Sequence, residues 1–70
     1  MVMNNIKIDS EFIKLDSFLK WAGVASTGAE AKMFILDGEV LVNGEVEERR
    51  GRKLFRDDVI TFDGEQYKVI

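Results

Sequence analysis

Apolar residues in the first half of the chain recur with the spacing of amphipathic helices. One stripe at positions i, i+3, i+4 and i+7 predicts a helix over about 15–22, with Gly23 as its stop. A second helix is predicted to begin at Thr27, where Thr27-Gly28-Ala29-Glu30 has capping-box spacing, and to end at Gly38. The short connector between them predicts a helical hairpin. The inward-facing residues are expected to be Leu15, Phe18, Leu19 and Ala22 in the first helix and Ala31, Phe34 and Ile35 in the second.

The remaining segments alternate between apolar and polar residues, which is typical of strands. Ile6-Lys7-Ile8 is predicted to be a short strand that ends at the turn formers Asp9 and Ser10. Two hairpins are predicted where 40–42 and 45–47 flank Asn43-Gly44, and where 59–62 and 66–70 flank Asp63-Gly64. The order of elements predicts one α+β domain over residues 1–70, a helical hairpin packed on a small, mostly antiparallel sheet.

Composition excludes most catalytic chemistry. The 70 residues include no His, Cys or Pro. The chain therefore cannot form a Ser-His-Asp or Cys-His catalytic site, and it cannot form the common zinc sites that use His or Cys ligands. We expect a protein that is not an enzyme and has no catalytic residue, metal or cofactor. The N-terminus lacks a signal-peptide pattern, and apolar runs such as Met33–Leu36 are short, so we expect a cytoplasmic protein that does not contact membranes.

Charge is distributed unevenly along the chain. The formal net charge is −3, from ten basic and thirteen acidic residues, yet positions 49–56 hold no acid. Guanidinium groups pair with phosphate oxygens and release counterions, so this run predicts phosphate contact. The alternative is a solvated loop whose arginines pair with Glu45, Glu47 and Glu48 upstream. The basic residues are Arg49, Arg50, Arg52, Lys53 and Arg56.

The start of the second helix is another candidate anion site. Ser26, Thr27, Gly28 and Ala29 could leave backbone amides open to an anion, with Lys14 and Lys32 beside them. The simpler interpretation is that Thr27 and Glu30 satisfy those amides.

An aromatic residue, Trp21, is a third candidate for contact with a ligand. Trp21 lies off the apolar stripe of the first helix and could stack on a base, although covering the core edge is the favoured interpretation. The remaining rings are expected in the core or on the sheet: Phe12, Phe18, Phe34, Phe55, Phe62 and Tyr67.

Many of these positions together have the spacing of a known domain family, over about residues 14–62. They are Lys14-Leu15-Asp16, Leu19, Gly23, Ser26-Thr27, Ala31, Phe34-Ile35, Gly38, Val40, Val42-Asn43-Gly44 and Asp58-Val59-Ile60. The pattern resembles the RNA-binding domain named for small-subunit ribosomal protein four, the S4-like domain with its αL motif. From Gly44 to Leu54 it is similar to the small stand-alone bacterial members of the YaaA/YbcJ type.

This resemblance implies a face that binds structured RNA. Two departures from the family pattern shift the expected binding toward Arg49–Lys53: Gly28 stands where relatives often have Arg, and Arg56-Asp57-Asp58 replaces a common Pro-Gly-Asp turn. By resemblance, the RNA-binding residues are Lys14, Thr27, Gly28, Lys32, Arg49, Arg50, Arg52 and Lys53.

The leading hypothesis is a monomeric RNA-binding protein that contacts ribosomal or tRNA-like RNA, or a ribosomal particle. The family is expected to recognise RNA by shape and backbone. The alternative is a protein-interaction adaptor whose basic loop docks acidic partners.

Overall fold

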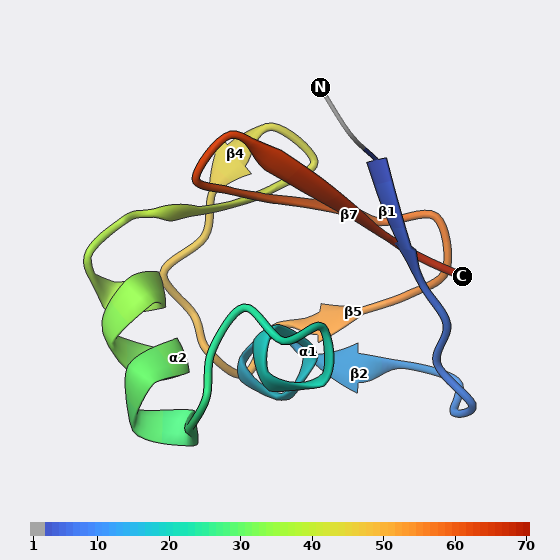
Figure 1. Ribbon diagram of the computed structural model, residues 1–70, viewed down its shortest axis with the longest axis horizontal. Helices are drawn as coiled ribbons and strands as arrows, with labels where there is room; N and C mark the ends of the chain where they lie inside the picture. Colours follow the sequence, from blue (N-terminus) through green and yellow to red (C-terminus); the bar gives the residue numbers. More distant parts are fainter. Residues whose placement is uncertain (1–2) are drawn as a thin grey trace.

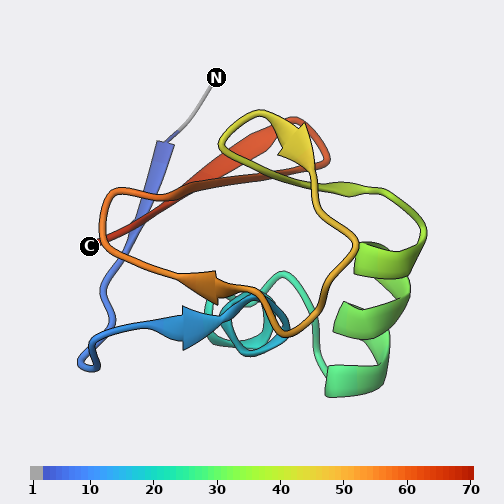
Figure 2. The same cartoon turned by 180° about the vertical axis from the view of Figure 1, so that it is seen from behind.

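The computed structural model describes residues 3–70, which form two helices and seven strands. Both helices fall where the sequence predicts them, to within two residues at each end. In the views of Figures 1 and 2, the larger sheet lies along one side of the molecule, with α1 opposite and α2 at one end. The elements are β1 Met3–Ile6, β2 Ile13–Lys14, α1 Leu15–Trp21, α2 Gly28–Leu36, β3 Val40–Val42, β4 Glu45–Val46, β5 Lys53–Leu54, β6 Val59–Phe62 and β7 Glu65–Val69.

The larger sheet has the strand order β1-β7-β6-β3-β4. Its pairs are antiparallel except β1 with β7, so the predicted mostly antiparallel sheet is confirmed. Both predicted hairpin turns are present. Asn43 and Gly44, and likewise Asp63 and Gly64, have positive φ angles, which is what a two-residue turn of this type requires.

The predicted first strand is wrong in its position. β1 ends at Ile6 and does not reach Ile8, because its extent is set by parallel pairing with β7, where Ile6 lies opposite Val69. Beyond Ile6 the chain leaves the sheet, although Ile8 still donates its amide hydrogen to Ile70 and is buried.

A second, two-stranded sheet was not predicted. β2 and β5 pair antiparallel, with Ile13 opposite Leu54 and Lys14 opposite Lys53. Lys53, the last residue of the expected basic loop Arg49–Lys53, therefore lies in a strand. Two-residue strands are too short to show alternation, and these two come from distant parts of the sequence.

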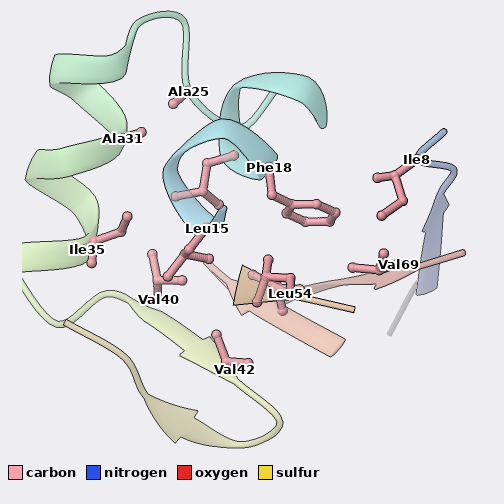
Figure 3. Packing of buried hydrophobic residues seen from close by; sticks show 12 residues of the cluster. Ile8, Leu15, Phe18, Ala25, Ala31, Ile35, Val40, Val42, Leu54 and Val69 are labelled. Atoms are coloured by element: carbon pink, nitrogen blue, oxygen red, sulfur yellow. The ribbon is translucent and has the colours of Figure 1, made fainter. Parts of the chain in front are cut away.

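The core lies between the helices and the two sheets. In Figure 3, Leu15 and Phe18 of α1 project among side chains from both sheets and from the segment that follows β1. The predicted inward stripes are largely confirmed, since Ala22 and Phe34 are the members that are only partly buried. Neither helix within residues 3–70 has the length and apolar character needed to cross a bilayer. The buried apolar residues are Ile8, Leu15, Phe18, Leu19, Ala25, Ala31, Ile35, Val40, Val42, Leu54, Ile60 and Val69.

Candidate nucleic-acid interface

The basic loop, residues 49–53, is organised around one buried carboxylate. Glu47 follows β4 and has a side chain that is 8% exposed. Its Oε2 accepts hydrogen bonds from the backbone amide and Nε of Arg49, both at 3.0 Å. Its Oε1 accepts from Nη2 of Arg49 at 3.0 Å and from Nη1 of Arg52 at 2.9 Å. These four bonds hold both ends of the loop to one side chain.

The same contacts keep Glu47 ionised. Hydrogen bonds from Arg49 are the main reason that its pKa falls from 4.5 to about 2, with Arg52 adding to the effect and burial opposing it. Hydrogen bonds to the charged form of a carboxylate favour that form. A buried carboxylate with four donors therefore stays charged at neutral pH and fixes the loop through charge-assisted bonds.

Backbone hydrogen bonds hold the basic loop against α1. Leu15 and Asp16, the first two residues of the helix, donate their amides to the carbonyls of Arg52 at 2.8 Å and Arg50 at 3.1 Å. These helix amides have no partner within α1, so the loop supplies the carbonyls that they need. The loop backbone is thus fixed at both its carboxylate and its helix contacts, and the side chains of Arg50 and Lys53 remain exposed.

The β2–β5 ribbon brings basic and aromatic side chains onto one face. Lys14 lies opposite Lys53, so the same register places Phe12 opposite Phe55. Directly opposed residues of an antiparallel pair share a face, as do residues two apart. The two rings are 6.0 Å apart between centroids, and Lys53 Nζ lies 4.7 Å from the Phe12 centroid. We call these four residues the cationic ribbon face.

Three cations of the basic loop and the β2–β5 ribbon have no acidic partner among the described residues. Among residues 3–70, Lys14, Arg50 and Lys53 take part in none of the salt bridges. Two positive charges directly opposite each other are destabilising in a sheet. Their placement at the end of a fixed loop therefore favours a site for an anion.

The alternative interpretation of the basic run is correct for two of its arginines. Arg49 and Arg52 pair with Glu47. Glu45 and Glu48 form no salt bridge within the described part of the chain. Arg49 nevertheless keeps a side chain that is 75% exposed, compared with 32% for Arg52. Arg49 can therefore face a partner while holding Glu47, whereas Arg52 is mainly structural.

The start of α2 is capped as predicted. Thr27 Oγ1 accepts from the Glu30 amide at 3.1 Å, and Glu30 Oε1 accepts from the Ser26 amide at 2.8 Å. The Glu30 carboxylate thus bonds the amide of Ser26, the residue before the N-cap, whereas in a standard capping box it would bond the amide of the N-cap residue itself. Thr27, Gly28 and Lys32 are exposed, and Figures 1 and 2 both show the start of α2 at the same end of the molecule as the basic loop.

Comparison with known proteins identifies the fold and the family. The family model described as S4 domain matches residues 6–70. The chain belongs to the S4 domain family. This assignment confirms the resemblance noted in the sequence.

Two curated relatives of this S4 domain are small proteins of similar length. One is the probable ribosome maturation protein RlbA of Bacillus subtilis, 51% identical over 87% of this chain and 86% of the relative. The other is the putative RNA-binding protein YbcJ of Escherichia coli, 34% identical over 83% of each chain.

Solved structures show the same fold. The solution structure of E. coli YbcJ, described as having an αL motif involved in RNA binding, aligns with a TM-score of 0.74 at 30% identity. The alignment covers 100% of this chain and 90% of that one. Ribosomal protein S4e from Thermoplasma acidophilum also aligns with a TM-score of 0.74, at 24% identity, and the alignment covers 89% of this chain and 33% of that one.

The exposure of one aromatic residue of this S4 domain differs from the sequence prediction. Trp21 was expected to cover the core edge, but it is 62% exposed. Phe55, expected in the core or on a sheet, is 46% exposed and lies on the cationic ribbon face.

Proposed function

We propose that this S4 domain binds structured RNA, as a non-enzymatic protein of ribosome maturation. The names of RlbA and YbcJ support an RNA partner and a ribosomal context. The observation that carries the proposal is the juxtaposition of Lys14, Arg50 and Lys53, without acidic partners in residues 3–70, on a loop fixed to α1.

Recognition would operate through the RNA backbone. Lys14, Arg50 and Lys53 would contact phosphates directly, and the exposed guanidinium of Arg49 would add a fourth contact. An A-form major groove is too deep and narrow for side chains, so shape and phosphate position would carry selectivity. A loop held in place before binding loses less conformational entropy when it binds.

The start of α2 would extend this surface. Thr27 orders the first turn, Gly28 brings no side chain to hinder close approach of a phosphate, and Lys32 adds a charge one turn later. Arg52 would act through Glu47 and the loop conformation.

The test uses a charge-matched pair of double variants. Lys14→Gln with Lys53→Gln removes the ribbon cations, and Lys7→Gln with Lys68→Gln removes two lysines beside the β1–β7 pair of the larger sheet, outside the proposed interface. Binding to ribosomal RNA fragments and to tRNA is measured across a salt series. Each phosphate contact contributes about 0.7–0.9 to the slope of log K against log salt. The ribbon variant should lower that slope by about 1.5, while the control should leave it close to wild type.

Failure of the proposal would also be visible in this assay. If the wild-type protein shows no salt-dependent binding to structured RNA, RNA recognition is wrong. Capture of protein partners from a nuclease-treated lysate would then favour an adaptor that docks acidic proteins.

A further inference from the structure

Trp21 is a large apolar side chain that the fold leaves uncovered. It lies at the end of α1 and is 62% exposed. Its indole Nε1 donates to the Lys7 carbonyl at 2.9 Å, which satisfies the polar edge of the ring and sets its orientation. The exposed part of Trp21 is therefore aromatic surface on a ring that is already oriented.

A groove of about 360 Å³ runs beside this ring. Ile13, Ser17, Lys20 and Trp21 line it. Ser17, Lys20 and Trp21 have the i, i+3, i+4 spacing of one face of α1, and Ile13 belongs to β2, which leads directly into that helix, so the groove extends from β2 along α1 to Trp21. A volume near the lower end of the range for small-ligand pockets suits a single planar group.

The lining residues have the chemistry that recognises a nucleotide. Trp21 offers a π face, Lys20 a positive charge and Ser17 a hydroxyl that can donate or accept. Base–aromatic stacking is tolerant of sequence because every base has a π face. An acidic peptide would use Lys20 but would leave the aromatic surface without a matched partner.

We propose that Trp21 stacks on one unpaired nucleotide that adjoins the RNA helix bound by the basic loop. Lys20 is the contact for the phosphate of that nucleotide. From Lys14 to Lys20 the rise is about 9 Å at 1.5 Å per residue, so the groove lies within reach of a strand held at the cationic ribbon face. This inference rests on the proposed RNA function and adds that the preferred RNA has a junction between paired and unpaired segments.

The experiment compares two RNA probes with intrinsic fluorescence as the readout. One probe is a blunt RNA hairpin, and the other is the same hairpin with four unpaired adenosines at its 3′ end. Trp21 is the single tryptophan of the protein, so its emission reports directly on this groove. The extended hairpin should quench Trp21 and bind more tightly than the blunt one. Stacking on one base is expected to contribute about a 5- to 150-fold difference in affinity.

Two variants separate stacking from structure, and because neither contains tryptophan, their affinities are measured from the fluorescence anisotropy of labelled hairpins. Trp21→Phe and Trp21→Leu both lose the hydrogen bond to Lys7, but only the phenyl ring keeps a π face. Trp21→Phe should retain most of the preference for the extended hairpin, and Trp21→Leu should lose it while binding the blunt hairpin as wild type does. Thermal melts of both variants confirm that they are folded and of similar stability.

The outcomes distinguish this inference from the proposed function. Equal binding of the two hairpins by wild type, or an unchanged preference in Trp21→Leu, would overturn stacking and leave RNA binding intact. Quenching by adenosine monophosphate alone, at the concentration that the extended hairpin requires, would overturn the RNA-junction assignment in favour of a free-nucleotide site. Absence of binding to either hairpin would overturn both proposals.

Discussion

Replacing Glu47 with Gln should reveal how strongly one carboxylate organises the basic loop. Glu47→Gln keeps the size of the side chain but removes its charge. The carboxylate accepts four hydrogen bonds, two at each oxygen. An amide has one acceptor oxygen, and its NH₂ group would face a guanidinium donor instead of accepting from it.

The expected loss of stability follows from these contacts. Charged hydrogen bonds contribute about 1.5–3 kcal/mol each, although solvent around the 75% exposed Arg49 side chain weakens its share. We expect a total loss of about 1–2 kcal/mol in the free energy of unfolding. For a domain of this size that corresponds to a fall of about 5–15 °C in Tm. Urea unfolding at pH 7 measures the free energy directly.

The pH dependence provides the sharper test. The pKa of Glu47 is lowered in the folded state from 4.5 to about 2, so its contribution is fully present above pH 4.5. That contribution is lost as the pH falls through the folded pKa, because the unfolded state binds the proton first. The difference in unfolding free energy between wild type and Glu47→Gln should therefore shrink below pH 4.5 and vanish near pH 2.

A difference that stays constant from pH 7 to pH 2.5 would refute this account. It would mean that Gln perturbs packing around position 47 rather than removing a charge. The conservative variant Glu47→Asp separates these possibilities further, since it retains the charge but shortens the reach toward Arg49 and Arg52.

Three further substitutions test other parts of the structure. Thr27→Ala should lower the free energy of unfolding by about 1 kcal/mol because it removes the N-cap of α2. Thr27→Ser keeps the capping hydroxyl, so its Tm in a thermal melt should stay close to that of the wild type. Asn43→Ala should lower the free energy of unfolding by about 2 kcal/mol, because Asn43 has a φ of 52° and its side chain bonds both the Asp58 carboxylate and the Val59 amide. Asn43→Gly should lose less stability, because glycine adopts a positive φ without strain. Arg56→Gln should lower the free energy of unfolding by about 1 kcal/mol, because the guanidinium donates hydrogen bonds to the Ile8 and Ser10 carbonyls. The salt dependence of RNA binding should stay unchanged in this variant.

The elements with strong local signals could be predicted from the sequence. The stripe through Leu15, Phe18 and Leu19 gives α1, because burial of one helix face requires that spacing. Asn43-Gly44 gives the first hairpin, because positive φ at two successive positions narrows the choice of residues. In each case the determining interactions lie within a few residues of each other.

The features that were missed depend on contacts between distant residues. β2 and β5 are two residues long and pair across some forty positions, so no local period marks them. The extent of β1 is likewise set by β7 at the other end of the chain. The exposure of Trp21 depends on which elements pass over the end of α1, which local spacing does not specify.

The basic run shows why a charge count along the sequence is a poor guide to a binding surface. Five cations fall within eight positions, but Arg49 and Arg52 bind Glu47, and Arg56 binds backbone carbonyls of the N-terminal segment. The surface charge is instead supplied by Arg50 and Lys53 together with Lys14, which is distant in sequence and adjacent through the ribbon. A buried acid at the centre of this cluster lowers its net charge yet fixes its geometry. Because a mobile loop would lose conformational entropy on binding RNA, the order that Glu47 imposes can outweigh the charge that it cancels.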